Sequence, residues 1–112
     1  MLLGCRHLAA IAATCVMAAG VAAAQSKSKP AVHTVTIEAT AFKPDVVDAK
    51  VGDTVVWINK DMFPHTATSK AANFDSGTLA TGKSWKYKLT KKGEFAYVCT
   101  FHPTMKGTIR VK

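Results

Sequence analysis

The sequence contains little that would support a helical or disulfide-bonded domain. Only three of its 112 residues are cysteines, and 15 Lys and Arg stand against 7 Asp and Glu. Cys5 and Cys15 lie in an N-terminal segment with the composition of an export signal, so an exported chain keeps Cys99 alone. A disulfide framework is therefore excluded, and one small domain must gain its stability from its core, a bound metal or both.

The first 24 residues predict a cleaved signal peptide. Arg6 precedes an uncharged, Ala-rich run, residues 8–24, that ends in three alanines of the kind that signal peptidase reads. A membrane anchor is the alternative, but 17 such residues fall short of the roughly 20 strongly apolar ones that a bilayer requires. We therefore expect the mature chain to begin at Gln25 in the periplasm, with no membrane span.

The exported part is strongly basic. Its 88 residues carry 14 Lys and Arg against 7 Asp and Glu, a formal charge of +7. Nucleic-acid binding is disfavoured, because the aromatic residues follow strand periodicity rather than basic clusters and export removes the usual target. The charge instead predicts acidic protein partners.

Beyond a flexible leader, residues 25–31, the chain has the patterns of β-structure. Alternating or β-branched runs predict strands at residues 33–38, 54–59, 85–89, 94–99 and 106–111. No stretch has a convincing helical period, although residues 68–77 fit either a short helix or a long loop. Short strands separated by turns predict a single all-β domain over residues 32–112, a β-sandwich or barrel.

Aromatic residues at period two on these strands are expected in the core. They are Trp57, Trp85, Tyr87, Phe95 and Tyr97. Tyr97 is also a candidate for the tyrosine corner of sandwich domains. His33 has no evident partner in the sequence, so we expect it at the surface.

The stretch from Cys99 to Met105 concentrates groups that bind metals. A thiol, an imidazole and a thioether, from Cys99, His102 and Met105, directly follow a predicted strand. His65, 34 residues before Cys99, supplies a second imidazole. Two His and one Cys with a weak axial Met suit copper, in a way that zinc, magnesium and calcium sites do not.

Core packing of Cys99 and Met105 beside unrelated histidines is the alternative interpretation. An unpaired thiol in an exported protein is a liability unless something occupies it, and a second His on an upstream loop has no structural need to be there. The four residues together therefore favour the metal site.

These motifs resemble the type 1 (blue) copper proteins of the cupredoxin family, above all the branch that includes amicyanin, plastocyanin and pseudoazurin. The similarity extends over about residues 32–112. It includes the segments 51–55, 57–59, 64–65 and 74–77, the Gly-x-Phe-x-Tyr-x-Cys approach to Cys99, and the ligand loop. The Cys-x-x-His-x-x-Met spacing is the short form that amicyanins use. The resemblance implies a Greek-key β-sandwich of the cupredoxin type with one type 1 copper per chain.

One position departs from the family pattern. Many members have Asn directly after the upstream ligand His, where its side chain ties the two ligand loops together, whereas this chain has Thr66. A hydroxyl group makes a similar bond with shorter reach. We also expect Met62, Phe63, Phe101, Pro103 and Thr104 to form a flat apolar patch around an exposed ligand His.

We conclude from the sequence that the protein is a periplasmic electron carrier and not an enzyme, since all four copper positions are filled by protein groups. The resemblance implies a monomer that exchanges electrons with a dehydrogenase or a cytochrome through the edge of His102. The alternative is a copper-binding or delivery protein of metal homeostasis.

Overall fold

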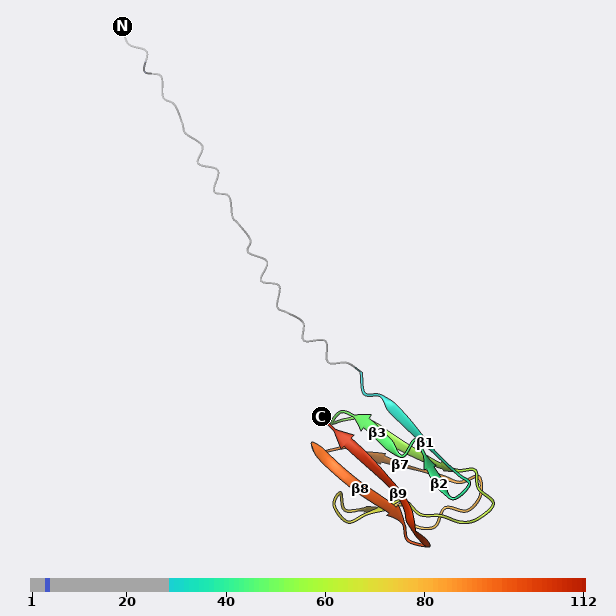
Figure 1. Ribbon diagram of the computed structural model, residues 1–112. Helices are drawn as coiled ribbons and strands as arrows, with labels where there is room; N and C mark the ends of the chain where they lie inside the picture. Colours follow the sequence, from blue (N-terminus) through green and yellow to red (C-terminus); the bar gives the residue numbers. More distant parts are fainter. Residues whose placement is uncertain (1–3, 5–28) are drawn as a thin grey trace.

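The described chain consists of β-strands. The computed structural model describes Gly4 and residues 29–112 (Figure 1), so the predicted signal peptide and most of the leader lie outside the described residues. The strands are β1 (Val32–Glu38), β2 (Ala41–Lys43), β3 (Val46–Ala49), β4 (Thr54–Asn59), β5 (Thr68–Ser69), β6 (Phe74–Asp75), β7 (Ser84–Lys88), β8 (Gly93–Cys99) and β9 (His102–Val111). Within this part of the chain there is no helix that could cross a membrane.

The strands form two mixed sheets that pack as a sandwich. One sheet has the order β2-β1-β4-β7 and the other the order β3-β9-β8-β5-β6. β1 pairs in parallel with β4, and β3 in parallel with β9, while all other pairings of named strands are antiparallel. Parallel neighbours cannot be joined by hairpins, so the chain passes from one sheet to the other between them. The predicted all-β sandwich is confirmed.

The five predicted strands correspond to β1, β4, β7, β8 and β9, and the four short strands were missed. Residues 68–77 form neither of the two expected structures, because β5 and β6 pair antiparallel there. β9 begins at His102, four residues earlier than the alternation of its sequence indicates. Strands of two to four residues show too few alternations for a sequence pattern to detect.

Aromatic rings fill the space between the sheets, as predicted. Trp57 and Tyr97 are fully buried, and Trp85, Tyr87 and Phe95 pack against the same core. Burial raises the pKa of the Tyr97 phenol to about 12. The expected tyrosine corner is wrong, because this hydroxyl group has no hydrogen-bond partner among the described residues. The nearby indole N–H of Trp57 offsets part of this rise in the pKa of Tyr97, although the two groups do not form a hydrogen bond.

The expectation that His33 has no partner is also wrong, although its side chain is 27% exposed. Its Nε2 lies 2.9 Å from a carboxylate oxygen of Asp53, which also accepts hydrogen bonds from the backbone N–H groups of Ala31 and Lys50. These bonds, that of His33 first, lower the pKa of Asp53 to about 2. The Asp53 carboxylate therefore ties the start of β1 to the turn before β4. A sequence pattern does not reveal this pair, because its two residues lie 20 positions apart.

Candidate metal centre

β8 and β9 bring Cys99 and His102 together through an irregular pairing. The register runs from Tyr97↔Gly107 to Val98↔Lys106 and then jumps to Cys99↔His102. Residues 103–105 therefore bulge out of the ladder, and Pro103, which has no N–H group to donate, belongs to this bulge. A bulge redirects side chains, so His102 and Met105 are not held to the alternation of a regular strand.

Three donor atoms converge at this end of the sandwich. Single ligand atoms of His65, Cys99 and His102 all lie within 4.8 Å of one another. The Cys99 Sγ is 3.7 Å from Nδ1 of His65 and 3.9 Å from Nδ1 of His102. Met105, three residues after His102, is buried in the same core cluster as Cys99. The structure thus brings together the three predicted His and Cys ligands and buries the predicted axial Met beside them.

These separations fit a bound metal ion. An ion such as zinc has bonds of about 2.3 Å to sulfur and about 2.0–2.1 Å to imidazole nitrogen. At a trigonal angle these bond lengths separate the sulfur and nitrogen atoms by about 3.7–3.8 Å. The Cys99 thiol is fully buried and has no disulfide partner among the described residues, so a thiolate in this position requires a cation beside it. The donor set of two imidazoles, a thiolate and a thioether suits copper.

The loop that carries His65 is held by an antiparallel bridge. The backbone N–H and carbonyl groups of His65 both bond to the backbone of Leu79. At the end of β4, the buried Asn59 amide donates hydrogen bonds of 2.8 Å to the carbonyl oxygens of Phe63 and Leu79. Protein hydrogen bonds therefore hold the backbone that carries this imidazole.

Asp61, which was not among the residues predicted for the site, orients the ring of His65. Its carboxylate accepts a hydrogen bond of 2.9 Å from Nε2 of the fully buried His65, which leaves Nδ1 free to face Cys99. The backbone N–H groups of Thr40 and Met62 donate to the same carboxylate. These bonds, that of Thr40 first, hold the pKa of Asp61 below its usual range. A carboxylate four residues before a candidate ligand His was the available signal.

Replacing Asp61 with asparagine should weaken copper binding. An amide can donate to Nε2 and so favour the tautomer with its proton on Nδ1, the atom that faces Cys99. We expect the affinity for copper to fall by about 10–100-fold, measured by competition with a chelator of known affinity. Asp48→Asn, an exposed carboxylate on β3, should leave the affinity unchanged. Equal affinities of the Asp61 variant and the parent protein would contradict this role.

Thr66 ties the two ligand-bearing segments together, as the sequence suggested for a hydroxyl group. Its Oγ1 accepts a hydrogen bond of 2.9 Å from the backbone N–H of Thr100 and lies 3.1 Å from the Thr100 hydroxyl. Its own backbone N–H donates to the Cys99 sulfur at 3.3 Å. Thr66 thus fixes the sulfur and the upstream loop relative to one another.

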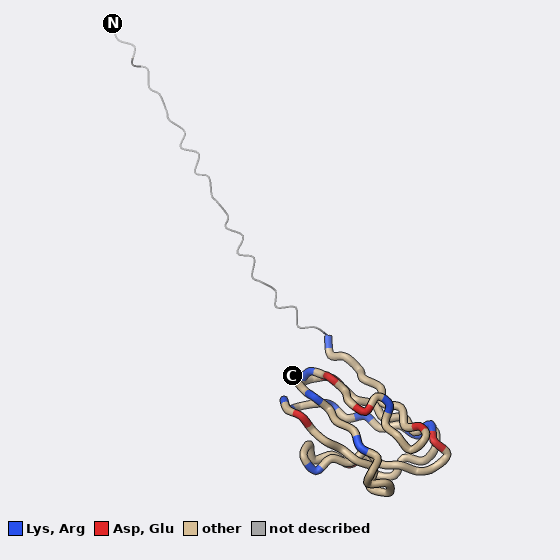
Figure 2. Tube along the Cα trace, in the orientation of Figure 1, with Lys and Arg blue, Asp and Glu red and all other residues tan. Residues whose placement is uncertain are grey.

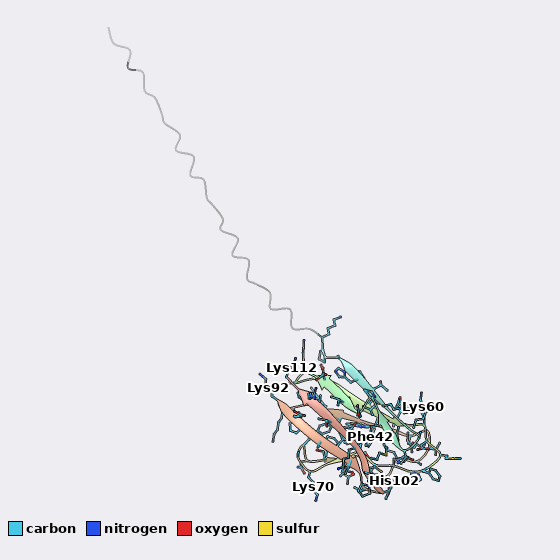
Figure 3. The ribbon with its side chains drawn as sticks, viewed as in Figure 1. Phe42, Lys60, Lys70, Lys92, His102 and Lys112 are labelled. Atoms are coloured by element: carbon cyan, nitrogen blue, oxygen red, sulfur yellow. The ribbon has the colours of Figure 1, made fainter. Side chains whose placement is uncertain are left out.

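The end of the domain that carries His102 is apolar. Met62, Phe63 and Phe101 are 79%, 54% and 50% exposed, and Pro103 and Thr104 are exposed too. All five residues that the sequence assigns to an apolar patch are therefore at the surface, and their contiguity stays a prediction. In Figure 3 the half-buried His102 lies at the opposite end of the domain from Lys92 and Lys112. In Figure 2 the loop between β8 and β9 carries neither blue nor red, whereas charged positions lie along the strands and on the neighbouring loops.

A family comparison agrees with the site. Residues 8–111 match the family model described as a cupredoxin-like domain. The chain belongs to the cupredoxin family. It is 30% identical over 110 residues to amicyanin-alpha of Methylorubrum extorquens, a match that covers 94% of this chain and 92% of the relative.

Solved cupredoxin structures have the same fold. A mutant of amicyanin in its Cu(I) form superposes with a TM-score of 0.67 at 26% identity, covering 72% of this chain and 82% of that one. The Cu-containing nitrite reductase of Thermus scotoductus gives a TM-score of 0.69 at 33% identity, but the match covers 76% of this chain and only 23% of the reductase. The cofactor of this cupredoxin is therefore copper, which the donor set fits.

Proposed function

We propose that this cupredoxin is an electron-transfer protein of the periplasm that holds one type 1 copper between His65, Cys99 and His102, with Met105 as the weak axial ligand. The convergence of three donor atoms within 4.8 Å carries the proposal. Copper supplies the exchange of one electron. His65 and Cys99 are fully buried and Met105 is nearly so, which leaves the half-buried His102 as the ligand closest to solvent.

The surroundings of the site favour electron transfer over catalysis. Four protein donors leave no open position for a substrate, which hydrolytic or oxygenase chemistry needs. The hydrogen bonds of Asp61 and Thr66 orient His65 and join the two ligand-bearing segments, which would limit rearrangement when a bound copper ion exchanges an electron. The apolar patch around His102 offers a partner a small surface to dock on, as a transient complex requires.

The rival function is copper binding for delivery to another protein. A delivery protein must pass the ion on, and so needs its donors accessible, whereas the thiolate and one imidazole here are 0% exposed. This burial favours the carrier. The two functions differ in how readily they release copper.

Loading the copper-free protein with Cu(II) separates these functions. A carrier should become intensely blue with one ion per chain, because a short thiolate–copper bond gives strong charge transfer, and should be reduced and reoxidised reversibly. Its copper should stay bound for hours in the presence of an excess of chelator, measured by absorption. A pale complex that loses its copper to the chelator within mixing time would assign the protein to delivery.

The location, the domain limits and the partners belong to the same proposal. Residues 1–24 act as a cleaved signal peptide and residues 25–31 as a leader to the cupredoxin domain of residues 32–112. The mature protein is a monomer that meets an acidic dehydrogenase or cytochrome as electron donor or acceptor. The formal charge of +7 on the exported residues and the uncharged patch at His102 support such partners.

Encounter with an acidic partner should slow as salt is added. The Debye length falls from about 30 Å at 0.01 M to about 10 Å at 0.1 M, so the attraction of the basic surface is screened. Lys106, exposed and next to the buried Met105, should contribute most, and Lys106→Glu should slow association measured by stopped flow. Lys88→Glu on β7 is the matched control and should have a smaller effect. If the rate of association changes neither with salt nor with Lys106→Glu, docking depends on the apolar patch alone.

A further inference from the structure

Four oxidisable aromatic rings form an unbroken chain through the core. The ring centroids of Tyr97 and Trp57 lie 5.4 Å apart, those of Trp57 and Trp85 5.6 Å, and those of Trp85 and Tyr87 5.8 Å. The rings come from β8, β4 and β7, so the chain crosses from one sheet to the other and then runs along the edge strand. Tryptophan and tyrosine are the side chains from which a protein most readily loses an electron without breaking a bond.

Packing alone does not explain these residue types. The indole nitrogen of Trp57 and the hydroxyl oxygen of Tyr97 are buried and have no hydrogen-bond partner in the part of the chain that the structure describes. Each such unsatisfied group costs about 1–3 kcal/mol, which a phenylalanine of similar shape would avoid. Phe74, which contacts Trp57, Trp85 and Tyr87, shows that the core accommodates a phenylalanine directly beside these rings. Trp57 and Tyr97 are therefore costly for stability, which points to a role in chemistry.

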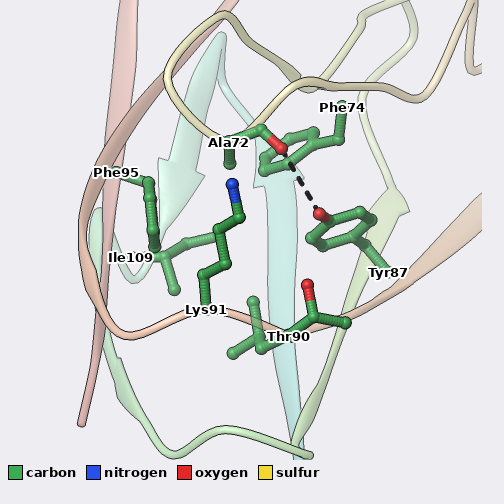
Figure 4. A pocket seen from close by; sticks show the side chains of 8 residues that line it. Ala72, Phe74, Tyr87, Thr90, Lys91, Phe95 and Ile109 are labelled. Atoms are coloured by element: carbon green, nitrogen blue, oxygen red, sulfur yellow. Dashed lines mark hydrogen bonds between the residues drawn. The ribbon is translucent and has the colours of Figure 1, made fainter.

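The two ends of the chain have different surroundings. Tyr97 precedes Cys99 by two residues on β8, so its side chain stands next to that of the candidate copper ligand on the same face of the strand. Tyr87, at the other end, is half-buried and lines a surface pocket with Ala72, Phe74 and Lys91, where its hydroxyl donates to the Ala72 carbonyl oxygen at 3.4 Å (Figure 4). The row of rings thus leads from the neighbour of Cys99 to a pocket on the edge strand β7. His102 does not line this pocket.

We propose that Tyr97, Trp57, Trp85 and Tyr87 form a second electron route, by which the reduced copper site repairs core aromatic residues that have lost an electron to an oxidising radical. A one-electron oxidant, such as the hydroxyl radical, takes an electron and a proton from Trp85 or Tyr87. The electron that restores the side chain would come from the reduced copper site and tunnel across the ring of Tyr97 to Trp57, and the proton returns from solvent at the Tyr87 pocket. Tyr97 acts as a bridge that keeps its own proton, because its buried hydroxyl group has no acceptor among the described residues.

The direction of this transfer follows from the redox chemistry of the groups. Tryptophan and tyrosine radicals are far stronger oxidants than blue Cu(II), so the electron moves only from Cu(I) toward the radical. Tunnelling rates fall exponentially with distance, so several short steps between neighbouring rings are faster than one long step. Electron exchange with a partner protein at His102 would not use the aromatic route, because Cu(II) is too weak an oxidant to take an electron from Trp or Tyr. The inference rests on the proposed function, since it needs a copper site that reaches Cu(I).

Pulse radiolysis with azide radicals, which oxidise Trp and Tyr side chains, tests the route. In the metal-free protein we expect the absorption of Trp radicals to give way to that of Tyr radicals. In the Cu(I) protein we expect these radicals to decay faster while the blue absorption rises, in a first-order step whose rate is independent of protein concentration. If the rate at which the blue absorption rises increases in proportion to the protein concentration, the electron passes between molecules. That result would overturn the proposal.

Variants distinguish this route from direct oxidation of the copper site. Trp57→Phe, and the half-buried Trp85→Phe as a variant less exposed to folding problems, should abolish the concentration-independent rise of the blue absorption. Phe74→Leu, which disturbs the same packing but removes no oxidisable ring, should retain it. Blue protein that reacts equally fast with and without these two tryptophans would overturn the route and leave the proposed function intact. Failure to form any blue site would overturn both.

Discussion

Gly107→Ala is expected to destabilise the domain by about 3 kcal/mol or more, at the upper end of the range for overpacked cores. A Cβ atom at Gly107 would overlap Cζ and the hydroxyl oxygen of Tyr97, which stands opposite it in the β8–β9 ladder. The ring cannot swing aside, because Phe42 packs edge-on against it at 4.6 Å and Trp57 at 5.4 Å. Gly107 is thus required for its lack of a side chain and not for an unusual backbone conformation.

Urea unfolding of the metal-free protein measures this effect without a contribution from copper binding. Lys106→Ala, an exposed neighbour in the same strand, is the control and should change the free energy of unfolding by no more than about 0.5 kcal/mol. Combining Gly107→Ala with Tyr97→Leu should cost less than the sum of the two single changes, because the overlap disappears. A Gly107→Ala protein as stable as its parent would show that the ring of Tyr97 can move.

Long-range pairing explains which parts of the fold were predictable. β4 and β8 carry six or seven residues of β-branched, aromatic and alternating sequence, and a pattern of that length identifies a strand by itself. β2 and β3 have three and four residues, and they exist because β1 and β9 present edges for them to pair with. The pairing of residues distant in sequence decides such strands, and a local pattern contains no information about it.

The same distinction applies to the site. Residue type and spacing were enough to predict that His65, Cys99 and His102 would converge, because few chemistries use that donor set. The position of the Asp61 carboxylate, which orients His65, depends on a hydrogen bond from the backbone N–H of Thr40, 21 residues away in sequence. The jump in register at Cys99 is likewise a property of the β8–β9 pair and not of either strand. Ligand identity is therefore a local property of the sequence, and ligand orientation is a property of the fold.

Orientation by the fold also explains how one small domain can serve a redox metal. The upstream loop is fixed by Asn59 and Asp61, and Thr66 joins it to the segment after Cys99. These contacts are made by protein groups alone, so they orient the side chains that would hold the ion. Supporting contacts of this kind orient the ligands of a metal site and would limit their movement when a bound copper ion exchanges an electron.

Cys99→Ser should abolish the blue colour and lower the affinity for copper by more than the roughly 100-fold upper range for loss of a supporting contact. The thiolate is the only sulfur anion that the described residues place beside the two imidazoles, and a serine hydroxyl stays protonated and binds copper weakly. The fold should persist, because serine can still accept the hydrogen bond from the Thr66 backbone N–H at this position.

Absorption and circular dichroism spectra of the copper-loaded variant check both expectations in one sample. Thr104→Ala, an exposed position within the bulge between His102 and Met105, is the matched control and should remain blue. A Cys99→Ser protein that keeps its β-sheet spectrum but gives a pale complex supports Cys99 as the equatorial ligand. A serine variant as blue as the parent would mean that the colour arises elsewhere, and the assignment of His65 and His102, which rests on their distances to this sulfur, would fail with it.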